Sequence, residues 1–172
     1  TMAYSCALFA TPGEDLETAQ RRKFHRLMDL ARLGPDDHVL EIGCGWGGFA
    51  IEAVRRTGCR ITGITISEAQ LRLAQERVQA AGLADRIELR LMDYRDLKGQ
   101  YDRIVSIEML EAVGEDYWPT YFSTLQRCVR PGGRIALQVI TIDEARFAGY
   151  RRTPDFIQLT RCIPRFSSGR LS

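Results

Sequence analysis

Three glycines at alternate positions, Gly43, Gly45 and Gly47, form the part of the sequence best suited to holding a ligand. They separate an apolar run at 38–42, typical of a short buried strand, from a segment at 48–57 that is expected to be helical. Glycines between a strand and a helix permit tight backbone angles and let main-chain N–H groups approach a ligand. The spacing fits both G-x-G-x-G and the dinucleotide pattern G-x-G-x-x-G, and a turn required only for packing remains an alternative.

The acidic residues around this loop distinguish between ligands. A nicotinamide site needs an acid about 20 residues further on to hold the ribose, whereas the second predicted strand ends at 63–66 with no acid before Glu68. Glu41 places a carboxylate before the first glycine, where it would repel a pyrophosphate but attract an ammonium or sulfonium group. S-adenosylmethionine carries both cations, so it is the expected ligand.

Strand-like and helix-like segments alternate through the chain. This alternation predicts an α/β fold with a doubly wound, mainly parallel sheet and helices on both faces. The glycine turn would then lie at the carboxyl end of the first strand, where this topology binds ligands. The first helix is expected to be entered at Thr11-Pro12, with the proline in its first turn, and to end near Leu33. Further strands are expected at 59–65, 87–92, 102–107 and 134–142, and further helices at 67–81 and 117–129.

The composition is typical of a single soluble globular domain. The chain has 172 residues and a formal net charge of +2, with 27% charged and 45% hydrophobic residues. This near-neutral balance disfavours nucleic acid as a partner. Five cysteines without a C-x-x-C pair indicate neither a disulfide framework nor a metal site. No apolar run reaches the roughly 18 residues of a membrane-spanning helix, so we expect a cytoplasmic protein with at most peripheral membrane contact.

Five segments are distinctive: Met2 to Ala7, Glu41 to Gly48, Thr62 to Gln70, Asp93 to Leu97, and Asp102 to Ile107 followed by Glu111. Together they resemble one family, the cyclopropane fatty acid synthases and the related mycolic acid methyltransferases. The glycine motif alone is typical of the whole class I methyltransferase superfamily, and the other segments make the likeness more specific. The resemblance covers roughly residues 2–158. It implies a Rossmann-like class I methyltransferase fold, S-adenosylmethionine as methyl donor, and the double bond of an unsaturated fatty acyl lipid as acceptor.

The resemblance also assigns cofactor contacts by position. The loop from Val39 to Gly47 would cradle the cofactor, with Tyr4 and Ser5 closing over its methionine end and Asp93 and Tyr94 meeting its adenine. Asp93 is also suited to begin a turn. The expected cofactor-binding residues are Tyr4, Ser5, Glu41, Gly43, Cys44, Gly45, Gly47, Thr65, Ile66, Gln70, Asp93 and Tyr94.

Gln70 has two interpretations. The resemblance places it, with Thr65 and Ile66, against the ribose, in the position where a nicotinamide site would have an acid. The pattern Ser67-x-x-Gln70 is also that of a capping box at the start of a helix. The two roles are compatible.

For the chemical step, the resemblance implies a bound bicarbonate that removes a proton after methyl transfer. In the family it is held by a cysteine near the amino end, a glutamate after the fourth strand and a histidine on the fifth. Cys6 and Glu111 match the first two, but Gln138 stands at the histidine position and Ala112 follows Glu111 in place of a histidine. Gln138 can donate a hydrogen bond to an anion but cannot titrate. Bicarbonate as a cofactor, and a cyclopropane or a methylated alkene as product, therefore stay open.

The resemblance ends before the chain does. The family continues into a region that helps cover the substrate, whereas 159–172 is an arginine-containing polar stretch without that pattern. We expect a methyltransferase core over 1–158 and an atypical, poorly ordered tail, as in a truncated member that binds S-adenosylmethionine but shows little or no lipid methylation by itself. The alternatives are a small-molecule N- or O-methyltransferase, a nicotinamide-binding module, and a cofactor-binding remnant without activity.

Overall fold

The computed structural model describes residues 2–146 and 149. The chain divides into two compact units, Thr1–Val139 and Ile140–Ser172. In the second unit the described part begins with 140–142 and continues in a short turn, where the N–H of Arg146 donates to the carbonyl of Asp143 at 2.9 Å. The predicted tail at 159–172 lies outside the described residues. The elements described below all belong to the first unit.

The first unit is built on a parallel sheet of five strands in the order β3-β2-β1-β4-β5. Each neighbouring pair is parallel, so the chain must cross back over the sheet after every strand. The order reverses between β1 and β4, which is the signature of a doubly wound sheet. The predicted fold class is therefore confirmed. The strands are β1 (His38–Ile42), β2 (Arg60–Thr65), β3 (Ile87–Leu91), β4 (Tyr101–Ile107) and β5 (Val129–Gln138).

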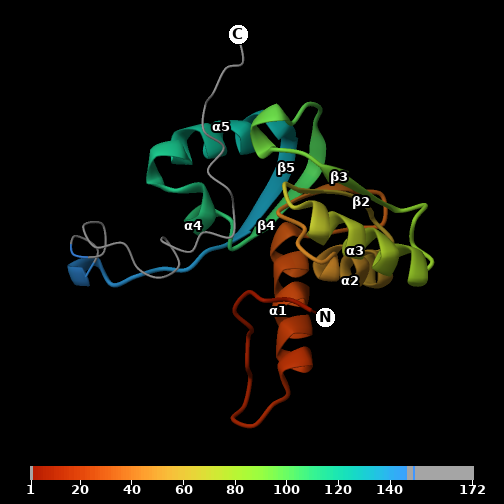
Figure 1. Cartoon of the computed structure of the whole chain (residues 1–172), viewed down its shortest axis with the longest axis horizontal. Helices are drawn as coiled ribbons and strands as arrows, with labels where there is room; N and C mark the ends of the chain where they lie inside the picture. The colour runs from red at the N-terminus through yellow and green to blue at the C-terminus, as the bar shows by residue number, and fades with distance from the viewer. Residues whose placement is uncertain (1, 147–148, 150–172) are drawn as a thin grey trace. The chain divides into compact units, whose positions relative to one another are not determined.

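Helices cover both faces of the sheet (Figure 1). Helices α1 (Leu16–Ala31), α2 (Gly48–Thr57) and α3 (Glu68–Ala80) pack on one face, and α5 (Trp118–Cys128) packs on the other. A one-turn helix, α4 (Leu110–Val113), follows β4. In the part of the chain that the structure describes, no helix is both long and apolar enough to cross a membrane.

Side-chain alternation along the strands divides the apolar residues into two cores. In β1, Val39 packs among residues of α1 and α2, while Leu40 and Ile42 pack among residues of α5. This follows from the two-residue period of a strand, which sends successive side chains to opposite faces. Because both faces are covered, β1 and β2 are buried at every position after their first residue, as expected of a parallel sheet.

The start of the first helix differs from the prediction. Helix α1 begins at Leu16, and Pro12 lies before it in a turn where the N–H of Glu14 donates to the carbonyl of Thr11. Asp15 is the N-cap, because its carboxylate accepts a hydrogen bond from the N–H of Thr18 at 3.0 Å. A side-chain cap satisfies an N–H group that the helix leaves unpaired, so it determines the first turn more strongly than a nearby proline does.

The fifth strand is also displaced from its predicted position at 134–142. Val129 already pairs with Tyr101, and the expected turn at 131–133 is an irregularity within the strand, where Gly132 has a φ of +77°. The strand ends at Gln138, which pairs with Ile107, the last residue of β4. A bulge lets a Gly-containing strand bend without leaving the sheet, and pairing stops where the neighbouring strand stops.

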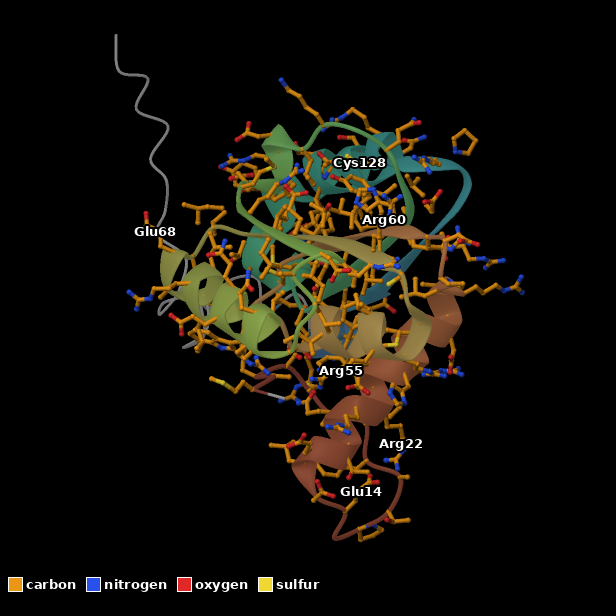
Figure 2. All side chains as sticks on the ribbon, turned by 90° about the vertical axis from the view of Figure 1, so that its right-hand side faces the viewer. Glu14, Arg22, Arg55, Arg60, Glu68 and Cys128 are labelled. Atoms are coloured by element: carbon orange, nitrogen blue, oxygen red, sulfur yellow. The ribbon has the colours of Figure 1, made fainter. Side chains whose placement is uncertain are left out.

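The N-terminal segment, residues 2–14, folds back along α1 (Figure 1). The N–H of Leu8 donates to the carbonyl of Ala19 at 3.2 Å, and Arg22 donates to the carbonyl of Leu8 at 3.1 Å. Arg22 also forms an ion pair with Glu14, and Figure 2 shows these two side chains together at the end of α1 far from the sheet. These contacts direct the first residues of the chain toward the carboxyl edge of the sheet.

We predict that Tyr121→Phe lowers the free energy of unfolding by about 1–2 kcal/mol, the usual effect of removing a buried hydrogen bond. The hydroxyl of Tyr121 donates to Oγ of Ser106 at 2.8 Å, and Ser106 donates to the carbonyl of Ile42 at 3.0 Å, so the two bonds connect α5, β4 and β1. Urea unfolding measures the change. Tyr117→Phe is the matched control, because Tyr117 is 53% exposed. Equal effects from the two substitutions would contradict the prediction.

Candidate functional site

The loop after β1 forms the tight turn that its glycines predict. Gly43, Gly45 and Gly47 have φ angles of +81°, +52° and +76°, in the left-handed region that favours glycine. The N–H groups of Gly43 and Cys44 both donate to the carbonyl of Ile64, at 3.0 and 2.9 Å. The loop is therefore fixed against β2 at the carboxyl edge of the sheet.

Packing explains two of the three glycines. A Cβ atom at Gly43 would lie 2.5 Å from Sδ of Met109, and one at Gly47 would lie 3.2 Å from Cβ of Ala74. At Gly45 the nearest atom is Cε1 of Tyr4 at 3.5 Å, which is an ordinary van der Waals contact. Close packing thus requires glycine at 43 and 47 but not at 45, where the bare backbone lies beside an aromatic ring.

Tyr4 brings the N-terminal segment to the start of α3. The amide nitrogen of Gln70 donates to the hydroxyl of Tyr4 at 3.3 Å, and the Thr65 hydroxyl donates to the amide oxygen of Gln70 at 3.1 Å. Ser67 caps α3 by accepting from the N–H of Gln70, while its own N–H donates to Oγ1 of Thr65. Half of the predicted capping box is present, and the Gln70 side chain is directed to Tyr4 and Thr65 instead of back to Ser67.

The residues predicted to meet adenine follow β3. Asp93 is the N-cap of the short helix η1 (Tyr94–Asp96), and its carboxylate binds the N–H of Arg95 at 2.9 Å and the guanidinium of Arg95 at 2.6 Å. Burial acts to raise the pKa of Asp93, but these hydrogen bonds outweigh it and lower the pKa below its usual range. The ring of Tyr94 packs edge-on against Tyr121. The predicted turn at Asp93 is present, and its contact with adenine stays a prediction, as does that of Ile66, which is 37% exposed after β2.

Glu41 is buried beneath the glycine loop, with 3% of its surface exposed. It lies beside Gly63 of β2 in the sheet register. Burial raises the pKa of this carboxyl well above its usual range, and its Oε2 has no hydrogen-bond partner among the described residues. Burial likewise raises the pKa of the neighbouring Cys44 thiol. Burial therefore favours the neutral form of Glu41, and its contact with a cationic ligand stays a prediction.

A carboxylate that the sequence analysis did not select joins two of the predicted catalytic residues. Oε1 of Glu108 accepts hydrogen bonds from the backbone N–H of Cys6 at 2.7 Å and from the amide of Gln138 at 2.8 Å. The same amide also donates to the carbonyl of Cys6 at 3.2 Å. Glu108 raises the pKa of the exposed Cys6 thiol, first by hydrogen bonding and then by charge repulsion, so the thiol is held in its neutral form.

Helix α1 supplies a buried cation next to this cluster. Lys23 is 4% exposed, and its ammonium donates to the hydroxyl of Ser5 at 2.5 Å. Burial lowers the pKa of Lys23 to about 8, while Glu108 and Cys6 act in the opposite direction. Gln20 donates to the carbonyl of Ser5 at 2.6 Å. Ser5 is thus anchored to α1 through both its side chain and its backbone.

The third predicted catalytic residue, Glu111, lies on α4 and is half-buried. Burial is the main cause that raises the pKa of the Tyr121 hydroxyl to about 12, and the charge of Glu111 adds a small effect in the same direction. The structure therefore brings Cys6 and Gln138 together through Glu108, and places Glu111 further along the same loop region after β4.

This geometry can be compared with known proteins. The family model for mycolic acid cyclopropane synthetase matches residues 1–171. The chain belongs to this family. The matched range includes the glycine loop, the sheet and the N-terminal segment that carry the candidate site.

Three relatives in the synthetase family illustrate the extent of the match. A tuberculostearic acid methyltransferase of Mycobacterium tuberculosis is 50% identical over 92% of this chain and 38% of its own length. The cyclopropane-fatty-acyl-phospholipid synthase of Escherichia coli is 40% identical over 81% of this chain and 35% of its own length. A mycolic acid cyclopropane synthase structure complexed with SAH and CTAB superposes with a TM-score of 0.78 at 28% identity, covering 92% of this chain and 55% of that one. The chain thus spans less than two fifths of the two curated relatives.

Glu108 and Lys23, two charged residues of the candidate site, were not predicted from the sequence. Glu108 directly follows β4, so its place at the carboxyl edge of the sheet was the only local signal for it. Lys23 is one of two lysines, but helical spacing alone does not tell which face of α1 meets the N-terminal segment.

We predict that one of the two lysines titrates near pH 8. Burial lowers the folded-state pKa of Lys23 to about 8 from the ordinary 10.5. Since the folded pKa is the lower one, this group adds stability above pH 10.5 and the contribution is lost as pH falls through 8. NMR of the lysine side chains against pH measures the pKa directly. Lys23→Met should remove the signal that titrates near 8 and Lys98→Met should retain it; the reverse outcome would contradict the burial argument.

Proposed function

We propose that this chain forms the cofactor-binding part of an S-adenosylmethionine-dependent carbon methyltransferase that acts on unsaturated fatty acyl lipid. The observation that carries the proposal is the bare, left-handed backbone of Gly45 beside the ring of Tyr4, at the carboxyl end of β1. Packing does not require glycine there; the left-handed φ favours it, and the backbone without a side chain leaves room for a ligand to lie along it. Membership of the synthetase family supports S-adenosylmethionine as that ligand.

The residues around the loop fit this cofactor by their chemistry. Tyr4 and Gln70 would bound it on the side of α3, with Thr65 orienting the Gln70 amide toward the ribose hydroxyls. Glu41 lies beneath the loop, where an ammonium group would favour its ionised form. Asp93 would accept from the adenine amino group while Arg95 keeps it ionised. The further loop and edge positions Ser5, Gly43, Cys44, Gly47, Ile66 and Tyr94 complete the proposed cofactor site.

S-adenosylmethionine supplies an electrophilic methyl group. The acceptor is inferred from the relatives, whose names refer to tuberculostearic acid and to fatty acyl phospholipid. A carbon–carbon double bond is a weak nucleophile, and its methylation leaves a cation on the acyl chain that a negative group in a dry site stabilises. Glu111 on α4 is proposed for that role. A lipid acceptor also implies contact with a membrane surface.

Bicarbonate does not fit the site as this chain builds it. Of the three residues expected to hold it, Cys6 through its backbone N–H and Gln138 through its amide both donate to the carboxylate of Glu108. A second anion at the same donors would meet the charge of Glu108 at hydrogen-bond range, which is unfavourable. We therefore derive no step from bicarbonate.

Calorimetric titration of the protein with S-adenosylhomocysteine and with NAD tests the cofactor class. We expect saturable binding of S-adenosylhomocysteine and none of NAD, because β2 ends without the acid that a nicotinamide ribose requires. NAD binding without S-adenosylhomocysteine binding would overturn the proposal. Incubation with labelled S-adenosylmethionine and mixed unsaturated phospholipids, followed by mass analysis of the acyl chains, then identifies the acceptor and the product.

We predict that Gly45→Val lowers the affinity for S-adenosylhomocysteine at least about tenfold, equivalent to 1.4 kcal/mol. The new side chain would occupy the space beside Tyr4 that the ligand needs. Gly82→Val is the matched control, because Gly82 also has a left-handed φ, of +68°, but has nothing within 4 Å of its Cβ position. Both substitutions carry a backbone strain of about 1–2 kcal/mol. Equal affinities in the two variants would show that the loop has been misassigned.

A further inference from the structure

We infer that Glu108 is the internal proton acceptor of the transfer site and occupies the position that a small anion would otherwise fill. The inference rests on the proposed methyl transfer and adds to it the residue that completes the reaction. It also explains why the site has a glutamine at 138, which cannot titrate.

Hydrogen bonds from two distant segments orient the carboxylate of Glu108. Its Oε1 accepts from the N–H of Cys6 and from the amide of Gln138, at 2.7 and 2.8 Å. Its own N–H donates to the carbonyl of Gln138 at 2.8 Å. The amide of Gln138 therefore acts as a fixed donor that orients a carboxylate, and a titrating side chain is not needed at that position. Because Oε1 is already bonded, we assign the second oxygen, Oε2, as the atom that accepts the proton released in the reaction.

The backbone of Glu108 is held in an uncommon conformation. Its φ is +52°, a left-handed conformation that is uncommon for residues other than glycine. Such conformations persist where surrounding contacts hold them, and they concentrate at functional sites. Here the N–H bond to β5 provides that hold. The chain keeps a carboxylate at a position where glycine would relieve the strain.

Glu108 also lies at the edge of the sheet that carries the glycine loop. Glu108 follows β4, the neighbour of β1 in the sheet, and the side chain of Met109 lies against Gly43 of the glycine loop. In a doubly wound sheet the crevice between these two strands is the ligand site. The carboxylate is half-buried there, with the buried ammonium of Lys23 acting on it electrostatically. One negative charge is thus already present beside one positive charge.

The proposed reaction consists of methyl transfer to the double bond and then removal of a proton by Glu108. The π electrons of the acceptor double bond form the new carbon–carbon bond to the donor methyl, and the sulfur–methyl bond breaks with its electron pair left on sulfur. The acyl chain then carries a cation. Glu108 removes a proton from it, and the electrons of that carbon–hydrogen bond form either a double bond or the third side of a cyclopropane. The neutral Glu108 acid afterwards releases the proton to water.

Two substitutions separate this role from a purely structural one. In Glu108→Gln the amide oxygen can still accept from Cys6 and Gln138, so the segment stays attached while the base is lost. Glu108→Gly fits the left-handed backbone and leaves the two donors without an acceptor, which opens the position to an added anion. Glu76→Gln, at an exposed position on α3, is the matched control.

The first measurement needs no turnover. Bicarbonate is titrated into each protein, and the pKa of Lys23 is followed by side-chain NMR as a reporter of negative charge in the site. We expect no saturable bicarbonate binding by the parent, a lower Lys23 pKa in Glu108→Gly and Glu108→Gln, and binding of bicarbonate by Glu108→Gly that restores the Lys23 pKa. Saturable binding by the parent, or none by Glu108→Gly, would overturn the inference.

The second measurement is methyl transfer to unsaturated phospholipid at saturating S-adenosylmethionine. Glu108→Gln should lose about 100-fold or more in rate, the usual scale of a proton-transfer residue, with S-adenosylhomocysteine affinity and Glu76→Gln activity unchanged. Bicarbonate should restore activity to Glu108→Gly and have no effect on the parent. Parent-like turnover by Glu108→Gln would overturn the inference while leaving the proposed function intact. A parent that does not bind S-adenosylhomocysteine would instead contradict the proposed function. The bicarbonate titration would still show whether Glu108 occupies the position of a small anion.

Discussion

One oxygen atom, Oε1 of Glu108, joins three segments that are far apart along the chain. It accepts hydrogen bonds from Cys6, 102 positions away, and from Gln138, 30 positions away. Bonds to an ionised acceptor are shorter and stronger than those between neutral groups. The N-terminal segment is thereby attached to the edge of the sheet as well as to α1. It therefore helps to fix where Tyr4 lies beside the glycine loop, and the N-terminal side of the candidate site depends on it.

The sheet determines why these groups meet at one edge. After β1 the chain passes into α2 on one face, and after β4 it passes into α5 on the other. The two connections diverge at the carboxyl ends of adjacent strands, which leaves the intervening crevice to the glycine loop and to the residues that follow β4. Met109 packs against Gly43 at this point, so the loop and the acidic segment are held in contact. The N-terminal segment then approaches from α1 and completes the crevice.

Local sequence signals were sufficient for the repeating framework but not for the contacts between distant segments. The glycine turn, the parallel sheet and the Ser67 cap each follow from spacing within a few residues, and all are present. The displaced β5 could not be predicted, because its start depends on pairing of Val129 with Tyr101. Glu108 was missed for the same reason: its partners are distant in sequence, and a glutamate after a strand is by itself an ordinary surface residue.

The burial of Lys23 also determines how the protein can be attached to other molecules. The sequence contains two lysines among 24 basic residues, and the other one, Lys98, lies exposed in the turn before β4. Arginine guanidinium groups do not react under the mild conditions that couple amines to dyes or beads, since they stay protonated. Amine coupling will therefore reach the side chain of Lys98, on the turn between η1 and β4, and leave the ammonium beside Ser5 unmodified. Among the lysine side chains, the fold itself therefore places such a label or solid support at Lys98.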